Sequence, residues 1–575
     1  MTGPGSAGGR RLAALCLVWL ALPCAACGRS GRGGRRADLV LRGGPVFLAD
    51  SAGTVARAIA LRDNTVLAAG SLSEIEATIG PGTRVVELNG RLVTPGMNDA
   101  HSHIGSGGLS LLNLRLQGTS SLAEIEARVA EAVSAAAPGE WIEGRGWDHT
   151  RLAPEELGPG GWPTKEALDR AAPDNPVYLR RVDGHTAWVN SAALRLAGIG
   201  PDTPDPPGGE IILDPATGAP TGILKETAEE LVARVIPEPS DATVRRAIRA
   251  VLDLARRTGV TSVQTSATRR EIRMYRELLG KGELTARVYA WLPLTAENIA
   301  AYRRDGITAG FGDAWLRVGM LKGYSDGTLG SRTAWMLEPY TDDPSTRGIV
   351  TVPLSELEGL IREADEAGLQ VTVHAIGDAA NRAVLDAFAS LVAAGAERTR
   401  RHRIEHAQIL DRADIPRFAR LGVIASMQPT HATSDMRWAE TLIGRERAEE
   451  GAYAWRSLLD AGAAIAFGTD FAVEPLAPIE GIYSAVTRQS REEPGTPAGG
   501  WIPAQRLSVA EAIRLYTAGS AYAEFEEERK GTLEPGMLAD LVVWDRDLMS
   551  VSPEELLEAS PDLTIVDGQL VYETD

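Results

Sequence analysis

The chain has 575 residues, of which 44% are hydrophobic and 24% charged, as in an ordinary globular protein and unlike a disordered chain or a protein with many membrane spans. A chain of this length is too long to fold around one small hydrophobic core, so a large domain with at least one smaller unit is expected. The formal net charge is −18 although the first 37 residues carry six arginines and no acid, so the remaining body is strongly acidic and nucleic acid is excluded as a partner.

The N-terminus has the pattern of an export leader. Two arginines at 10–11 precede an apolar stretch at 12–26, which only Pro23 interrupts. The stretch is shorter than the roughly 20 apolar residues that cross a bilayer. Residues 1–26 are therefore predicted to be a signal peptide.

The cysteines give this leader a second interpretation. Cys16, Cys24 and Cys27 are the three cysteines of the chain, so the body forms no internal disulfide. The residues up to Cys27 resemble a bacterial lipoprotein signal, although Cys24 stands where that motif usually has Leu. Cleavage after Ala26 without lipidation is the alternative. Residues 27–37 are predicted to be a flexible tether, and the protein is expected outside the cytoplasm, with a lipid anchor at Cys27 as its membrane contact.

Short β-strands are predicted near both ends of the chain, at 39–42, 58–61, 65–68, 539–544 and 564–572. Because the two ends of a domain often lie close together, the segments 38–94 and 520–575 are predicted to form one composite β-sandwich.

The middle of the chain, 95–519, alternates short apolar strands with helices, as parallel βα units do. The clearest unit is a predicted helix at 354–367 followed by a strand at 369–374. This repetition predicts an α/β fold of the (β/α)8 TIM-barrel type. A Pro-, Gly- and Trp-rich stretch at about 118–237 lacks the repetition and is predicted to be an inserted cap.

Four of the eight histidines end predicted strands: His101, His103, His374 and His406. The carboxyl ends of barrel strands meet at one mouth, and residues two apart on a strand share a face, so these side chains are expected to converge. Asp470 ends a later strand and adds a carboxylate. Neutral imidazole with carboxylate suits one or two Zn²⁺ ions, with Mn²⁺, Fe²⁺ or Co²⁺ as alternatives.

These residues belong to ordered motifs that resemble the amidohydrolase superfamily, in the branch that contains N-substituted formamide deformylases. The motifs are Pro95-Gly96 with Asp99-Ala100-His101-Ser102-His103, Lys322 with Ser325-Asp326-Gly327, His374, Arg403-Ile404-Glu405-His406, Gly468-Thr469-Asp470 and Gly531-Thr532-Leu533 with Ala539-Asp540. The resemblance covers the chain from about residue 38 to its end. One departure is Gln264-Thr265-Ser266, where relatives often carry an acid; it is expected to influence substrate choice and to touch no metal ligand.

The resemblance implies a ligand set for two metal ions. His101 and His103 would hold one ion, His374 and His406 the other, and Lys322, if carbamylated, would bridge them. A lysine cation at the end of a buried strand is costly, and carbamylation would turn it into an anionic ligand. An unmodified, ion-paired Lys322 is the alternative.

Asp470 would bind metal and serve as the general base, taking a proton from the attacking water and passing it to the leaving nitrogen. Three residues are weaker candidates for substrate contact. His185 resembles a family segment that reaches the pocket, Trp147 could line the same cleft, and Asp326 belongs to the motif after Lys322. A structural role is the alternative for His185 and Trp147.

The implied reaction is hydrolysis of carbon–nitrogen bonds other than peptide bonds in a small-molecule substrate such as an amide or N-substituted formamide. The same ligands could serve a metal-assisted dehydratase, an isomerase or an ester hydrolase. A non-catalytic solute-binding lipoprotein is a third hypothesis, but it would have no need of Asp470 as a base.

His431, near a strand end, could lie behind the ligands. The sequence leaves a homodimer open.

Overall fold

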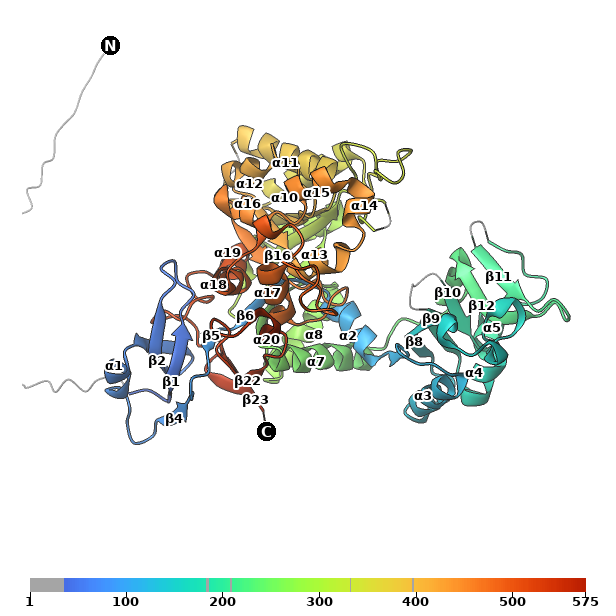
Figure 1. Ribbon diagram of the computed structural model, residues 1–575, viewed down its shortest axis with the longest axis horizontal. Helices are drawn as coiled ribbons and strands as arrows, with labels where there is room; N and C mark the ends of the chain where they lie inside the picture. The colour runs from blue at the N-terminus through green and yellow to red at the C-terminus, as the bar shows by residue number, and fades with distance from the viewer. Residues whose placement is uncertain (1–35, 182–185, 207–208, 331, 396–397, 575) are drawn as a thin grey trace, which may run out of the picture.

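The computed structural model describes residues 36–181, 186–206, 209–330, 332–395 and 398–574. The leader with its cysteines, including the predicted lipidation site Cys27, and the candidate His185 lie outside these residues. The described chain forms a barrel, a sheet built from both ends and an insertion (Figure 1). None of its helices is both long and apolar enough to cross a membrane.

The barrel contains eight parallel strands, confirming the predicted fold class. In barrel order they are β6 (Met97–Ser102), β13 (Val260–Ser266), β14 (Arg287–Pro293), β16 (Leu316–Tyr324), β17 (Gln370–Ala375), β18 (Arg403–His406), β19 (Ile424–Met427) and β20 (Ile465–Phe467). The helices that alternate with them are α7 (Asp241–Arg257), α8 (Arg269–Gly280), α9 (Ala296–Arg304), α10 (Leu354–Glu366), α11 (Asp378–Ala393), α12 (Ile415–Leu421), α16 (Trp455–Asp460), α17 (Pro478–Thr487) and α18 (Val509–Arg514). Further elements at the barrel are α2 (Ile104–Leu112), β15 (Phe311–Gly312), α13 (Pro429–Asp435), α14 (Ala439–Ile443), α15 (Arg445–Gly451) and α19 (Ser520–Ala523).

The barrel closes where the chain after β20 meets β6. The Asp470 backbone N–H donates to the carbonyl of His101 over 2.7 Å, and the His103 N–H donates to Phe471 over 2.5 Å. Gly468 permits this approach, because a Cβ at that position would lie 2.5 Å from the His101 nitrogen. Closure therefore places Asp470 directly beside the two histidines of the first strand.

Both chain ends contribute strands to one mixed sheet. Its strands are β1 (Leu39–Phe47), β2 (Val55–Arg62), β3 (Thr65–Gly70), β4 (Arg84–Glu87), β5 (Val93–Pro95), β21 (Leu541–Trp544), β22 (Pro561–Val566) and β23 (Gln569–Glu573), with short helices α1 (Leu72–Glu76) and α20 (Pro553–Leu556) beside them. Strand β5 pairs antiparallel with β21, and Leu41 and Val93 share an apolar cluster with Leu541 and Ile565. This shared core unites the two ends into one domain.

The beginning of the C-terminal segment packs differently from the rest of it. The carbonyl of Ser520 accepts from Gln264 Nε2 at 2.8 Å, and the carbonyl of Ala523 accepts from Gln370 Nε2 at 2.9 Å. Residues 520–523 thus lie against the barrel interior, and only from Leu533 onward does the segment enter the core of the sheet.

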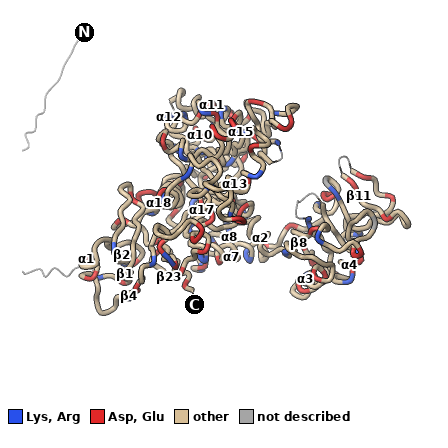
Figure 2. Tube along the Cα trace, viewed as in Figure 1, with Lys and Arg blue, Asp and Glu red and all other residues tan. Residues whose placement is uncertain are grey.

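The insertion is a compact unit with its own sheet. It comprises β7 (Leu114–Arg115), α3 (Leu122–Ser134), β8 (Ile142–Trp147), α4 (Lys165–Ala171), β9 (Val177–Arg181), β10 (Thr186–Val189), α5 (Ser191–Ala197), β11 (Gly209–Leu213), β12 (Pro220–Glu226) and α6 (Glu230–Ala233). Its apolar clusters are separate from that of the barrel, and it stands apart from the barrel beyond α2 (Figure 1). Acidic and basic residues are interspersed over all three parts (Figure 2).

Candidate functional site

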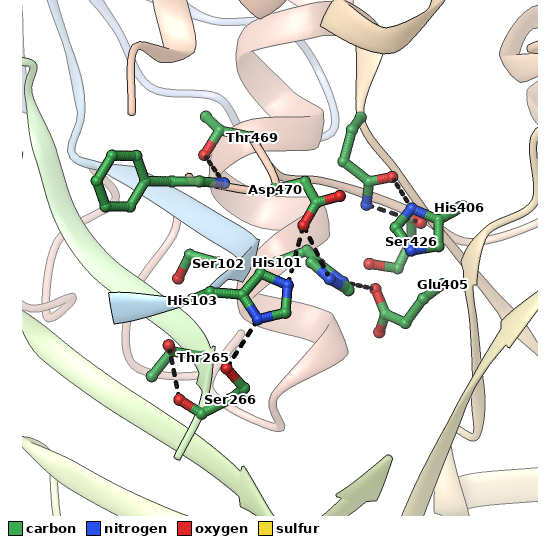
Figure 3. A network of polar contacts seen from close by, with 12 residues as sticks. His101, Ser102, His103, Thr265, Ser266, Glu405, His406, Ser426, Thr469 and Asp470 are labelled. Carbon is green, nitrogen blue, oxygen red and sulfur yellow. Dashed lines mark hydrogen bonds and ion pairs between the residues drawn. The ribbon is translucent and has the colours of Figure 1, made fainter. Parts of the chain in front are cut away.

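The predicted ligands meet at the carboxyl ends of the barrel strands. His101 lies in β6, Lys322 in β16, His374 in β17 and His406 at the end of β18, while Asp470 follows β20. Parallel strands place these ends at the same mouth. The side chains of His101, His103, His406 and Asp470 accordingly point toward one another (Figure 3).

One group of ligand atoms surrounds Asp470. Its Oδ1 lies 3.0 Å from His103 Nε2 and 3.4 Å from His101 Nε2, and these atoms all lie within 4.8 Å of one another. The Lys322 Nζ is 3.0 Å from the same nitrogen of His101. The structure therefore brings together the first predicted pair of histidines, the lysine and the carboxylate.

A second group lies next to it. The His406 and His374 ring centres are 4.6 Å apart, and the His406 and His101 ring centres are 5.0 Å apart. Ligand atoms of His406, His431 and Asp470 also lie within 4.8 Å of one another. His431 thus lies among the candidate ligand atoms, whereas the sequence predicted a position behind them.

The surroundings of His431 make it a hydrogen-bond donor to Asp470. Its Nε2 lies 3.2 Å from Asp470 Oδ2, and its Nδ1 lies 3.7 Å from Glu474 Oε1. Burial alone would lower its pKa, but hydrogen bonds to these two carboxylates outweigh burial and raise the pKa to about 10. Because carboxylates of Asp470 and Glu474 face the two ring nitrogens of His431, we assign the second group to His406 and His374.

Each of the four candidate histidine ligands has one ring nitrogen tied to the protein. His101 Nδ1 contacts Glu405 Oε2, His103 Nδ1 contacts the Ser266 hydroxyl, His406 Nδ1 contacts the Gln428 amide oxygen and His374 Nε2 contacts the Gly327 carbonyl. The tied nitrogen carries the proton when its partner is an acceptor, and the other nitrogen remains for a metal ion. The contact to Ser266 corrects the expectation that the 264–266 departure touches no ligand.

Burial favours the neutral form of three of these imidazoles, those of His101, His374 and His406, and the neutral form is the one that binds metal. It lowers the pKa of His101 and of His374 to about 4, with Lys322 as a further cause, and it lowers the pKa of His406 well below its usual value. Burial also lowers the pKa of the Lys322 ammonium. The site thus favours uncharged nitrogen donors.

Asp470, in contrast to the histidines, is held in its charged form. Burial raises its pKa, but the neighbouring His101, His103 and His431 outweigh burial and hold the pKa well below the usual range, so the side chain is a carboxylate. Its backbone φ is +59°, and that of His406 is +76°, which is uncommon for residues with a side chain and is typical of functional sites.

The donor set fits a transition-metal cation. Asp470 Oδ1 is buried and has no hydrogen-bond donor among the described residues, and it faces two imidazole nitrogens. Electron-rich atoms at 3.0 to 3.4 Å repel one another unless a proton or a cation lies between them. Imidazole nitrogen with carboxylate oxygen suits zinc and its neighbours in the transition series.

Two predicted substrate residues have other roles. Trp147 is fully buried in the insertion, where its Nε1 donates to the Leu179 carbonyl over 2.9 Å, so it does not line the barrel mouth. Asp326 is buried, and its carboxylate accepts backbone N–H groups from Ile376, Gly377 and Trp335. It joins the loops that follow β16 and β17, and its Oδ1 lies 3.4 Å from Nε2 of the candidate ligand His374.

Sequence reasoning did not identify the residues behind the ligands, which include Glu405, Ser266 and Gln428. Glu405 carried a usable signal, because an acid in a short buried strand needs a partner of opposite charge or a hydrogen-bond donor. Ser266 and Gln428 are ordinary polar residues at strand ends, and only the folded chain shows which histidine each contacts.

Comparisons with known proteins agree with this architecture. A model of the amidohydrolase family matches residues 84–572. The protein LONG AFTER FAR-RED 3 of Arabidopsis thaliana is 35% identical over 556 residues, which cover 93% of this chain and 92% of that protein. The N-substituted formamide deformylase of Arthrobacter pascens is 27% identical over 568 residues, which cover 93% and 98% respectively.

Among solved structures, an uncharacterized metal-dependent hydrolase from Pyrococcus furiosus matches with a TM-score of 0.73 and 30% identity. The match covers 89% of this chain and all of that one. The family model spans the barrel together with part of the sheet and thus includes every candidate ligand. The chain belongs to the amidohydrolase family.

Proposed function

We propose that this protein hydrolyses carbon–nitrogen bonds in small non-peptide amides, N-substituted formamides included. The observation that carries the proposal is the buried Oδ1 of Asp470, which lies among the nitrogens of His101 and His103 and has no hydrogen-bond donor within the described part of the chain. Membership of a family of hydrolases that act on carbon–nitrogen bonds supports it, as does the similarity to a protein named N-substituted formamide deformylase.

Zinc is the proposed ion, with manganese, iron or cobalt as alternatives that the same donors accept. The residues that would hold one or two ions are His101, His103, Lys322, His374, His406 and Asp470. A divalent transition-metal ion supplies Lewis acidity and lowers the pKa of water toward about 7.

Asp470 is placed to move the proton. Its carboxylate would take a proton from the attacking water as the water oxygen adds to the carbonyl carbon of the substrate. The same proton would then pass to the nitrogen as the carbon–nitrogen bond breaks, giving an acid and an amine. His431 holds Asp470 Oδ2 at 3.2 Å, which keeps Oδ1 turned toward the two histidines.

Lys322 would be carbamylated in the active protein. Burial favours its neutral amine, which is the form that attacks carbon dioxide. The new nitrogen–carbon bond releases one proton and leaves an anionic carbamate with two oxygen donors. Reconstitution of metal-free protein should therefore improve with added bicarbonate, and Lys322→Ala should lose that dependence.

The test uses purified protein reconstituted with zinc and bicarbonate and offered a panel of N-formyl amines, N-acyl amines and matched esters. We expect amine release that a chelator abolishes and zinc restores. Hydrolysis of the esters alone, or turnover that is indifferent to the chelator, would contradict the proposal. Zinc binding without turnover of any compound would favour a solute-binding role.

We also propose, from the leader sequence, that the protein is exported and lipidated at Cys27. Cys27→Ala should move the protein from the membrane fraction to the soluble fraction of the producing cell. Cys24→Ala is the matched control, because it removes a leader cysteine outside the modification position, and it should leave fractionation unchanged. Unaltered fractionation of Cys27→Ala would indicate plain secretion.

A further inference from the structure

The ring of His101 is anchored differently from the other candidate ligands. Its Nδ1 lies 2.5 Å from Glu405 Oε2, and neither side chain is accessible to solvent. The contacts of the other rings are longer: His103 and His406 lie 2.9 and 2.8 Å from a hydroxyl and an amide oxygen, and His374 Nε2 lies 3.0 Å from a backbone carbonyl and 3.4 Å from Asp326 Oδ1. Glu405 thus makes the shortest of these contacts and holds His101 through a fully buried carboxylate (Figure 3).

The position of Glu405 follows from its strand. Arg403 and Glu405 are two residues apart in β18, so both side chains point into the barrel. The Arg403 guanidinium lies 3.0 Å from Glu405 Oε1, and Thr372 Oγ1 donates to the same oxygen over 2.6 Å. With Oε1 occupied by these two donors, Oε2 is the oxygen that remains for His101.

Arg403 is itself fixed in place. It donates to the Ala100 carbonyl over 2.7 Å and to the Ser426 hydroxyl over 2.9 Å, and it also donates to Gln264 Oε1. The cation that neutralises Glu405 therefore cannot swing away, and the carboxylate stays charged inside the barrel. The Gln264 side chain, part of the sequence departure noted above, contributes to this support.

A carboxylate acceptor fixes the proton of His101 on Nδ1 and increases the electron density on Nε2. Nε2 is the atom that faces Lys322 Nζ and Asp470 Oδ1. We propose that Glu405 is the residue that positions His101 and sets the metal affinity of the site, and that it does so through its charge. The inference rests on the proposed metal-dependent function.

The experiment compares the zinc affinity of the wild type, Glu405→Gln and Ser266→Ala by competition with a chromophoric chelator. Gln keeps the size of Glu and an oxygen acceptor but removes the charge. We expect a 10- to 100-fold loss of zinc affinity for Glu405→Gln, the scale known for such supporting groups. Ser266→Ala removes the neutral anchor of His103 and should lose less than Glu405→Gln.

Wild-type affinity in Glu405→Gln, or an equal loss in Ser266→Ala, would overturn the inference. If Glu405→Gln does not fold, proton NMR of the wild-type zinc protein decides, because the inference requires the His101 proton on Nδ1, and a proton on Nε2 would refute it. Failure of this inference can be told apart from failure of the proposed function. A wild type that binds zinc but hydrolyses no amide would refute only the function. A zinc affinity that Glu405→Gln leaves unchanged would refute only this inference.

Discussion

At the scale of single residues, the site divides its tasks between nitrogen donors that burial keeps neutral and one carboxylate that its neighbours keep charged. The pKa of His101 and of His374 is lowered to about 4, whereas Asp470 remains ionised because three imidazoles surround it. A buried carboxylate at the barrel mouth can thus serve both as a ligand and as a base.

Asp470→Asn tests the second of these roles. Asn has nearly the same shape but cannot accept the proton from water, so we expect a folded protein that keeps much of its zinc and loses about 10²-fold or more in kcat. Steady-state kinetics and metal analysis check this outcome. Asp305→Asn, the same change at an exposed position after α9, should leave kcat unaltered. Near-normal turnover of Asp470→Asn would show that another group moves the proton, and His185 would be examined next.

At the scale of elements, periodicity predicted the barrel units closely. The predicted helix at 354–367 corresponds to α10 (Leu354–Glu366), and the strand at 369–374 corresponds to β17 (Gln370–Ala375). Periodicity and motifs did not predict the surroundings of Trp147. The sequence suggested that it lines the substrate cleft, but its ring packs edge-on against that of Trp188 within the insertion, with 5.5 Å between the ring centres.

Trp147→Ala should therefore destabilise the insertion and spare the metal site. Removing a fully buried Trp and its hydrogen bond should cost about 3–5 kcal/mol, because the cavity collapses only in part. Denaturant unfolding followed by Trp fluorescence measures the loss, and zinc content should not change. Leu196→Ala, at a position 59% exposed on α5, should change stability by less than about 0.5 kcal/mol. Unaltered stability of Trp147→Ala with reduced kcat/KM would restore Trp147 as a substrate residue.

At the scale of the whole molecule, a buried ion pair joins the barrel to the sheet of the two chain ends. Arg287 at the start of β14 lies 2.6 Å from Asp540 and 2.9 Å from Asp567, and the Arg287 and Asp540 side chains are only 2% and 5% exposed. A carboxylate buried to this extent is costly without its partner. The pair thus couples the stability of the two domains.

Arg287→Met should lower the free energy of unfolding by about 3–5 kcal/mol, because it leaves Asp540 buried and unpaired. The double variant Arg287→Met/Asp540→Asn should be more stable than the single variant, since it removes the orphaned charge. Urea unfolding of all three proteins measures the coupling. Arg249→Met, which breaks an exposed pair with Glu283, should cost less than about 1 kcal/mol. A double variant no more stable than Arg287→Met would mean that packing, not charge, joins the domains.

The sequence by itself determined the barrel, the strand-rich character of both ends and the residues that converge at the mouth. These features follow from local periodicity and from the rule that parallel strands share a carboxyl edge, which need no knowledge of distant contacts. His101, His374 and Asp470 were identifiable because each lies near a strand end: His101 and His374 are next to last in β6 and β17, and Asp470 comes three residues after β20.

The tertiary structure alone decided the partners of those residues. His101 contacts Glu405 more than 300 positions away, Ser266 supports His103, and His431 reaches Asp470 from a helix after the next-to-last strand. It likewise decided that Trp147 is buried within the insertion and that the buried Asp326 carboxylate lies 3.4 Å from His374 Nε2. Such contacts depend on how the barrel closes and on which side chain fills each space, and these are properties of packing that no local pattern encodes.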